Sequence, residues 1–411
     1  MLGVKVMPKL LQINVTANWG STGRIAEQIN NLAAEQGWET YIAYGRNGNP
    51  SNSKLIKTGG KAQVYEHYLE ERLFDNDGLA SRCATRKLVR RIDEIKPDVI
   101  HLHNIHGHWL NYKILFEYLA TLDVPIVWTL HDCWTFTGRC GHYEKLKCYK
   151  WRDEGCGRPC PMKQNDILRK ITEKTQYHFE LKKKLFTSVK NLTLVSVSSW
   201  LESQVSQSYL KGQHIQTIHN GVDIQTFSPQ EDLSLTLEKY GLTGKRYVLA
   251  VSSVWNEQKG FNDYCKLAPK IKDVVTLVLL GLNDELRNKV KEYGILGIPR
   301  TENMKELTDL YSGASVVLNL SYGESFGLTT VEGFACGTPS VVYRATASPE
   351  LITPDTGIVC EAGDVDAVAD AVRKLLTAEK PVAKCRELAE REYDQQKIYS
   401  QYVSLYNKLM L

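Results

Sequence analysis

Short runs of apolar residues alternate along the chain with longer segments of helical periodicity. This alternation is typical of parallel β-sheets that are covered by helices on both faces. In the first half of the chain, the apolar runs predict one doubly wound domain. Its strands are expected at residues 10–15, 40–43, 98–102, 125–129, 192–195 and 215–218.

The pattern lapses at 227–246 into Ser, Pro, Gln, Asp, Gly and Lys, and we interpret this stretch as the connection to a second α/β domain. Strands are expected there at 247–251, 276–280, 316–318 and 340–342, and residues 384–411 read as one long helix. A chain of 411 residues exceeds the usual size of a single core. We therefore expect domains at 1–227 and 246–390, with 391–411 forming a helix that returns to the first domain.

Charge and hydropathy exclude several classes of protein. The 51 basic and 47 acidic residues leave a net charge of +4, too small to imply nucleic-acid binding. Residues 1–15 lack the apolar region of a secretion signal, and no run reaches the roughly 18 apolar residues of a membrane span. A cytoplasmic protein is expected.

One glycine-rich stretch carries the strongest chemical signal. Glu324 lies between Gly323 and Gly327 after an expected strand, and Glu332 follows on the helix that opens near Gly327. Free backbone N–H groups at such a helix start suit a phosphate. The two carboxylates can accept hydrogen bonds from sugar or ribose hydroxyls. Together these features favour a sugar nucleotide.

The stretch from Glu324 to Glu332, followed by Gly337-Thr338-Pro339, resembles the E-x7-E element of retaining glycosyltransferases with the GT-B fold. The resemblance covers nearly the whole chain and implies two Rossmann-like domains that face each other across a cleft. It also implies that Glu324 contacts the transferred sugar and Glu332 the ribose. The backbone of Phe326, Gly327 and Leu328 would meet the sugar and the diphosphate.

Two further elements resemble parts of the family's site. Gly20, Gly23 and Arg24 follow the first strand and open a helix, where backbone can approach an anion closely, and the resemblance implies that they lie at the donor diphosphate or at the acceptor. Lys259-Gly260 resembles the end of the family's Gly-Arg...Lys-Gly element, but the arginine is absent here. Either Lys259 with the helix termini suffices, or Arg24 contributes, or the donor site is weakened.

Histidines end two strands of the first domain. The family places a histidine such as His131 beside the reacting sugar, while Asp132 and His103 are expected on the acceptor side. A core or metal role for His101 and His103 is an equal alternative. The Asn220-Gly221 turn is expected to shape the cleft, because Asn-Gly tolerates positive φ.

Five of the ten cysteines fall within an expected insertion at 133–161 that has little periodicity. A chain without an export signal is expected to keep its thiols reduced. Cys140, Cys148, Cys156 and Cys160 could bind a structural zinc, although none has close C-x2-C spacing. Free, packed thiols are an equal alternative.

A helix is expected at 167–186, with apolar residues near one side and lysines, including Lys182, Lys183 and Lys184, among the rest. The family often uses such a helix at an anionic membrane surface, so peripheral contact with the inner membrane is one hypothesis. We favour an ordinary basic helix packed on its own domain.

The sequence thus predicts a metal-independent, retaining glycosyltransferase. We expect a UDP- or GDP-sugar donor and a glycan or lipid-linked acceptor, in surface polysaccharide or lipopolysaccharide synthesis. No catalytic cofactor and no nucleic acid are expected. The alternatives are a sugar-nucleotide epimerase on the same fold and a non-catalytic protein that binds anionic polymers.

Overall fold

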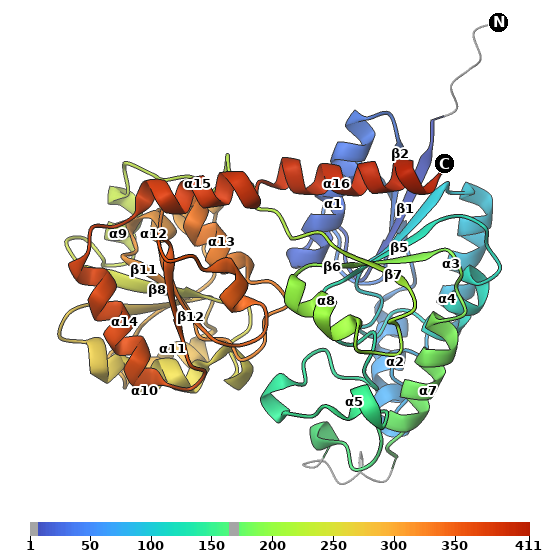
Figure 1. Ribbon diagram of the computed structural model, residues 1–411, viewed down its shortest axis with the longest axis horizontal. Coiled ribbons are helices and arrows are strands. Elements are labelled where there is room, and N and C mark those ends of the chain that lie inside the picture. Colours follow the sequence, from blue (N-terminus) through green and yellow to red (C-terminus); the bar gives the residue numbers. More distant parts are fainter. Residues whose placement is uncertain (1–6, 164–171) are drawn as a thin grey trace, which may run out of the picture. The chain divides into compact units, whose positions relative to one another are not determined.

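A computed structural model describes residues 7–163 and 172–411 (Figure 1). The chain divides into two compact units. The first contains the described residues up to Ile218 together with Tyr399–Leu411, and the second is His219–Ile398. Each unit is a parallel sheet with helices, as the hydrophobic pattern predicts.

The first unit is built on a seven-stranded parallel sheet with the order β3-β2-β1-β4-β5-β6-β7. Six strands were predicted; the seventh, β3, was missed because its residues are mostly exposed and form no apolar run. The strands are β1 (Lys9–Asn14), β2 (Glu39–Tyr44), β3 (Lys54–Lys57), β4 (Val99–Leu102), β5 (Ile126–Leu130), β6 (Leu192–Ser196) and β7 (His214–Thr217).

Helices follow most of these strands, as parallel pairing requires. They are α1 (Gly20–Glu35), α2 (Lys61–Phe74), α3 (Arg82–Ile95), α4 (Tyr112–Leu119), α5 (Lys150–Asp153), α7 (Thr175–Phe186) and α8 (Ser199–Val205), with short 3₁₀ turns η1 (Glu144–Leu146) and η2 (Pro161–Lys163). The region 133–161 contains only α5 and η1 as regular structure before η2, in line with its weak periodicity.

Every residue of β4, β5 and β6 is buried, and these central strands are mostly apolar. Each fully buried Leu or Ile in such a core contributes about 1.5–3 kcal/mol relative to an exposed position. The last part of the chain completes this core, because Tyr402 and Tyr406 are fully buried in the first unit. Their hydroxyls bond with Thr129 and His101 at 3.1 and 2.6 Å.

The second unit is a six-stranded parallel sheet with the order β10-β9-β8-β11-β12-β13. Four strands were predicted, and the short edge strands β10 and β13 were not. The strands are β8 (Tyr247–Val251), β9 (Thr276–Leu280), β10 (Leu296–Ile298), β11 (Val316–Asn319), β12 (Ser340–Tyr343) and β13 (Gly357–Cys360). The remaining elements are α9 (Ser234–Lys239), η3 (Glu257–Lys259), α10 (Phe261–Ile271), α11 (Asp284–Lys291), α12 (Met304–Gly313), α13 (Leu328–Ala335), η4 (Ser348–Leu351), α14 (Val365–Thr377) and α15 (Val382–Glu392).

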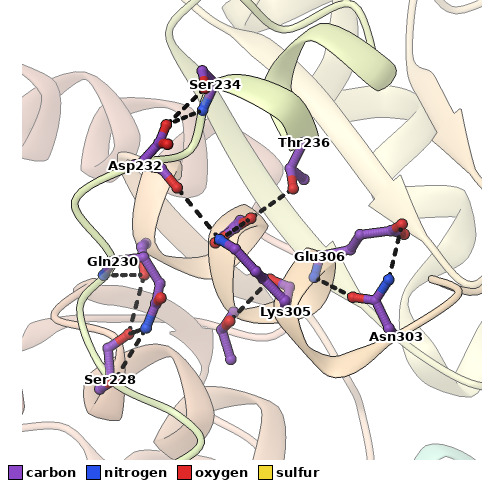
Figure 2. Close-up of polar contacts among 11 residues, drawn as sticks. Ser228, Gln230, Asp232, Ser234, Thr236, Asn303, Lys305 and Glu306 are labelled. Carbon is purple, nitrogen blue, oxygen red and sulfur yellow. Dashed lines mark hydrogen bonds and ion pairs between the residues drawn. The ribbon is translucent and has the colours of Figure 1, made fainter.

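The polar stretch 227–246 lies within the second unit and is held there by side chains (Figure 2). Thr236 of α9 donates to Asp309 of α12 at 2.6 Å, and the Lys305 ammonium lies 2.9 Å from the same carboxylate. Lys239 pairs with Glu306 at 2.7 Å. The polar residues of 227–246 therefore hold this segment on the second unit through hydrogen bonds and ion pairs with α12.

The prediction of one uninterrupted helix over 384–411 is wrong. The structure has two helices, α15 and α16 (Gln395–Leu409), separated at Tyr393 and Asp394. Val222 donates to the Tyr393 carbonyl at 2.7 Å and accepts from Gln395 N at 3.0 Å. The bridge uses the Tyr393 carbonyl and the Gln395 N–H, which a continuous helix would bond internally. No local sequence pattern predicts this bridge.

The Asn220-Gly221 turn also differs from expectation, because neither residue has positive φ. A Cβ on Gly221 would lie 2.4 Å from the Gln395 Cα. Glycine is therefore required by close backbone approach and not by a left-handed conformation.

The expected helix at 167–186 begins later among the described residues, at Thr175, and 164–171 lie outside them. The apolar side chains of Phe179, Leu185 and Phe186 are buried in the first unit. Lys182, expected on the polar side, is fully buried. None of the described helices is long and apolar enough to cross a bilayer.

Candidate active site

In the second unit, the carboxyl ends of the adjacent strands β8 and β11 bring Lys259 and Glu324 together. The Lys259 ammonium lies 2.6 Å from a Glu324 carboxylate oxygen, which also accepts from the Ser321 hydroxyl at 3.0 Å. Both side chains remain partly exposed, 31% for Lys259 and 18% for Glu324. The pair therefore combines a cation and a carboxylate that a ligand can reach.

Two glycines allow this arrangement. Gly260 has φ +74°, and a Cβ there would lie 2.2 Å from the Leu320 carbonyl oxygen. Gly327 has φ +110°, and a Cβ there would lie 3.0 Å from a Leu351 methyl carbon. Both positions combine a left-handed conformation with crowding, so side chains are disfavoured for two reasons.

Helix α13 begins directly after Gly327, and no side chain caps its start. Its first backbone N–H groups therefore lack intrahelical partners, which is the feature that suits an anion. Phe326 is 3% exposed, and its ring packs near the rings of His219 and Tyr393. Leu328 is half-buried at the first turn.

Glu332 lies one turn into α13 and accepts a hydrogen bond from the Tyr311 hydroxyl of α12 at 2.7 Å. Tyr311 is fully buried, and burial together with this carboxylate holds the pKa of its hydroxyl well above the usual value. The tyrosine thus remains a donor that fixes one carboxylate oxygen, while the Glu332 side chain is only partly buried.

In the first unit, His131 ends β5 and interacts through Nε2 with His103 Nδ1 at 3.1 Å. His103 in turn meets the Gln12 side chain of β1. Burial lowers the pKa of His131 to about 4. The imidazole is therefore neutral at physiological pH and is oriented by a buried polar chain.

His103 is only 2% exposed, and both its ring nitrogens have protein partners. It lies behind His131 and supports it. His101 is also fully buried, between Thr129 and Tyr406, which fits the core alternative for that residue.

Asp132 follows His131 and pairs with His106, a residue that the motif analysis did not single out. His106 Nε2 lies 2.8 Å from Asp132 Oδ2. The signal that could have found His106 is its place three residues after His103, just beyond the end of β4.

Gly20 and Gly23 open α1 after β1, as predicted. Gly20 has φ +66° and open space around it. A Cβ on Gly23 would lie 2.7 Å from the Thr16 hydroxyl oxygen, so this glycine lets the helix pack on its own loop. Arg24 is exposed.

Lys182 fixes the loop that follows β5. Its ammonium donates to the Trp134 carbonyl at 2.9 Å and lies 3.3 Å from the centre of the Trp134 ring. The indole N–H of Trp134 donates to Asp77 at 3.1 Å. Burial lowers the pKa of Lys182 to about 7, although Asp77 opposes this shift. Helical spacing alone could not reveal a buried lysine.

The thiols of Cys140 and Cys160 interact, and Cys148 and Cys156 are close enough to raise the pKa of Cys140 further. None of these cysteines is in a disulfide. Within the described ranges 7–163 and 172–411, no three His, Cys, Asp or Glu side chains are already arranged around a metal position. Zinc at these cysteines stays a prediction.

A wide hollow on the first unit lies at the opposite edge of the sheet, near the amino ends of β5, β6 and β7, and includes Asp123, Lys190 and His214. None of the residues with predicted chemical roles lines it. Ligands of open α/β sheets bind at the carboxyl ends of the strands, so we place the site at that edge.

The chain matches two family models. Residues 235–392 match "Glycosyl transferases group 1", and residues 20–226 match "Glycosyltransferase Family 4". These matches cover most of both units.

Among curated proteins, it is 24% identical over 97% of its length to the whole of the putative colanic acid biosynthesis glycosyl transferase WcaC of Escherichia coli. It is 29% identical to N-acetyl-alpha-D-glucosaminyl L-malate synthase of Bacillus anthracis, over 52% of this chain and 58% of that protein. For several other relatives, the match spans somewhat under half of their length.

Solved structures agree on the fold. Sucrose-phosphate synthase of Thermosynechococcus elongatus superposes with a TM-score of 0.70 at 16% identity, covering 98% of this chain and 99% of that one. Anabaena HepE in complex with UDP gives a TM-score of 0.67 at 15% identity, covering 98% and 100%. With two parallel α/β units and both family matches, the chain belongs to the group 1 glycosyltransferases of the GT-B fold.

Proposed function

We propose that this protein transfers a sugar from a UDP- or GDP-sugar to a hydroxyl of a glycan or lipid-linked acceptor, with retention of anomeric configuration. The observation that carries the proposal is the strand edge of the second unit, where Lys259, the start of α13, Glu324 and Glu332 lie on neighbouring elements. The complexes of HepE with UDP and UDP-glucose support a nucleotide-sugar donor. The likeness to WcaC supports surface polysaccharide synthesis, and the structural likeness to WaaG of lipopolysaccharide biosynthesis agrees with it.

In this proposal, the glycosidic bond to phosphate breaks, the acceptor oxygen bonds to the sugar carbon on the same face, and the leaving phosphate takes the acceptor proton. The diphosphate gains negative charge during this step. Lys259 and the N-terminus of α13 therefore stabilise the transition state more than the ground state. Glu324 accepts hydrogen bonds from hydroxyls of the donor sugar. His131 is neutral and forms a hydrogen bond with the same sugar without adding a charge.

We propose that transfer requires no metal ion and no other cofactor. Lys259 and the N-terminus of α13 supply the positive charge beside the diphosphate that a divalent cation would otherwise provide. The single lysine replaces the two cations expected from the family pattern, and its ion pair with Glu324 holds it at the site before the donor binds.

The first test is thermal unfolding of the purified protein with UDP, GDP, ADP or CDP, each with and without EDTA. Ligands that bind only the folded state raise Tm by mass action. We expect one nucleotide to give the largest shift, with the same shift in EDTA. Glu332→Gln should reduce that shift, whereas the exposed control Glu285→Gln on α11 should not.

Absence of any nucleotide-induced shift would contradict the donor site. A shift that EDTA abolishes would contradict metal independence. Product analysis then checks the reaction: a new glycoside supports transfer, and free hexose isomerisation without a glycoside would indicate an epimerase.

We further propose a structural zinc at Cys140, Cys148, Cys156 and Cys160. The insertion has little regular structure to hold it, and a zinc ion would draw its neighbouring thiols together. Four thiolate ligands would leave no open position for catalysis. Metal analysis should find about one zinc per chain, lost in Cys156→Ser and kept in the exposed control Cys83→Ser. A zinc-free, equally stable protein would contradict this.

Peripheral contact with the inner membrane is also part of the proposal, but on α2 and not on α7. Helix α2 exposes large apolar side chains at Tyr65, Tyr68, Leu69, Leu73 and Phe74. The next helix along the chain, α3, exposes Arg86, Lys87 and Arg90. Exposed aromatic and aliphatic side chains together with cations suit an anionic lipid surface.

Sedimentation with phosphatidylcholine vesicles, with and without phosphatidylglycerol, tests this contact. Binding should need the anionic lipid and should fall in Tyr65→Ser/Leu69→Ser. The control Leu235→Ser removes a side chain on α9 that is 78% exposed, and it should bind as wild type. Equal loss in both variants would argue against a site on α2.

A further inference from the structure

The loop after β12 holds a threonine in a backbone conformation that threonine rarely adopts. Thr346 has φ 50°, and among the described non-glycine residues with positive φ it is the only β-branched one. A branched Cβ crowds the backbone in the left-handed region, so this position costs stability. At two other left-handed positions beside the candidate site the chain has glycine, at Gly260 and Gly327. Thr346 differs from both by a side-chain hydroxyl.

The local turn gives no reason for this threonine. Ser348 N donates to the Ala345 carbonyl at 3.2 Å, which closes a tight turn with Thr346 and Ala347 at its centre. Ala347 has φ −79° and ψ −15°. Positive φ followed by these angles is the φ pattern of a type II′ turn, in which glycine is the usual residue at the first central position. Turn geometry alone therefore favours glycine at 346.

The hydroxyl of Thr346 binds the backbone of Glu324. The Glu324 N–H donates to Thr346 Oγ1 at 2.8 Å, and the Glu324 carbonyl accepts from the Ala347 N–H at 3.2 Å. The strands β11 and β12 are neighbours in the sheet, so the loops that follow them meet at one edge. Two consecutive residues of the turn thus hold the main chain of Glu324 on both sides.

The contacts of the Glu324 side chain are of a different kind. Its carboxylate pairs with Lys259 at 2.6 Å and accepts from the Ser321 hydroxyl at 3.0 Å. A donor that engages Lys259 through its diphosphate would compete with this ion pair. The bonds to the Glu324 main chain do not compete with a ligand, so they can keep the carboxylate in place while a donor is bound.

We propose that Thr346 is a positioning residue of the transferase, because its hydroxyl holds the Glu324 main chain and thereby fixes where the carboxylate meets the donor sugar. This inference rests on the proposed function, in which Glu324 accepts hydrogen bonds from that sugar. Thr346 acts only through Glu324. The strained conformation is tolerated because glycine, which suits the turn better, has no hydroxyl to supply.

Three substitutions separate the hydroxyl from the strain. Thr346→Gly removes both, Thr346→Val removes the hydroxyl and keeps the branch, and Thr346→Ser keeps the hydroxyl without the branch. Each variant is compared with wild type by thermal unfolding, by hydrogen exchange of the Glu324 amide and by hydrolysis of UDP-glucose and GDP-mannose. The control Lys96→Gly relieves a left-handed residue of φ 52° at the end of α3, in the first unit.

We expect Thr346→Gly to unfold at the wild-type temperature or above it. Thr346→Val should lose about 2–4 °C, since it keeps the strain and leaves the Glu324 N–H without its acceptor. In both variants the Glu324 amide should exchange about tenfold faster. Thr346→Ser should exchange as wild type.

The kcat of donor hydrolysis should fall about tenfold or more in Thr346→Gly and Thr346→Val, because a misplaced carboxylate loses contact with the sugar. The Tm shift given by UDP or GDP alone should be retained, since a free nucleotide carries no sugar for Glu324 to meet. Thr346→Ser and Lys96→Gly should keep the wild-type rate.

Wild-type exchange at Glu324 in Thr346→Gly, or hydrolysis by that variant within about threefold of wild type, would overturn the proposal. Rates that follow Tm across the variants, or an equal loss in Thr346→Ser and Thr346→Val, would indicate a merely structural role and would also overturn it. Absence of both donor hydrolysis and nucleotide stabilisation in wild type would instead be a failure of the proposed function. Hydrogen exchange would then still decide whether the hydroxyl holds the loop.

Discussion

In the second unit, the residues with predicted roles come from two short stretches, 252–260 and 319–333, whereas in the first unit, the cysteines apart, they are spread from Gly20 to Asp132. The second unit positions Lys259 and Glu324 through tight turns at Gly260 and Gly327. The first positions His131 and Asp132 through polar contacts with His103 and His106, which lie far from them in the chain. Nine of the ten histidines lie in the first unit, and only His219 lies in the second.

This contrast predicts which substitutions destabilise each unit most. The second unit should be most sensitive to changes at its glycine turns, and the first to the loss of buried polar side chains. The following predictions test it, from the largest expected effect to the smallest.

Lys182→Met should cost about 3–5 kcal/mol of unfolding free energy, because it removes the buried ammonium group that donates to two carbonyls and acts on Asp77. Urea unfolding measures the loss. The exposed neighbour Lys183→Met should change stability by less than about 0.5 kcal/mol. Nucleotide stabilisation should persist where the protein is folded, since Lys259, Glu324 and Glu332 lie in the other unit. A loss of equal size in both lysine variants would refute the role of burial.

Gly260→Ala should cost about 3 kcal/mol, since the new methyl group meets the Leu320 carbonyl in a left-handed conformation. It should also weaken nucleotide stabilisation, because Lys259 precedes it. Gly241→Ala is the matched control: its φ is +66°, but nothing lies within 4 Å of the added Cβ. That variant should cost only about 1 kcal/mol. If both variants lost a similar unfolding free energy, the left-handed backbone conformation alone would account for the loss, and the contact with Leu320 would add nothing.

Acid should destabilise the first unit. Burial depresses the pKa of His67 and His131 to about 4, against about 6.5 in the unfolded chain. The unfolded state therefore binds more protons between these values, and stability falls as pH drops from about 6.5 towards 4. One such histidine contributes about 2 kcal/mol of loss by pH 5. Urea unfolding at pH 7.5 and 5 should show this slope, reduced in His131→Gln. A slope that this variant leaves unchanged would contradict the assignment.

Tyr406→Phe should cost about 1 kcal/mol, because it removes the hydroxyl that bonds to buried His101. Tyr65→Phe alters a side chain that is 63% exposed and should have no measurable effect. Thermal unfolding of the two variants side by side gives the comparison. No difference between them would mean that the His101 contact adds nothing to stability.

The same contrast explains what the sequence could predict. Ten strands and the glycine-rich element around Glu324 were recognisable because apolar runs and glycine spacing are local signals. His106, buried Lys182 and the Val222 bridge were missed because each depends on residues far apart in the chain. The mostly exposed strand β3 lacks an apolar run altogether.

The buried tyrosines of α16 also constrain the order of events during protein synthesis. A chain emerging from the ribosome exposes all seven strands of the first sheet long before residues 399–411 appear. Until then, His101 and Thr129 lack their tyrosine partners and part of the core stays uncovered. The second unit is contiguous from His219 to Ile398, so all of its residues are available before 399–411 emerge and it can fold first. Stalled or truncated chains should therefore hold a finished second unit beside an unfinished first one, which is the form that chaperones and proteases would meet.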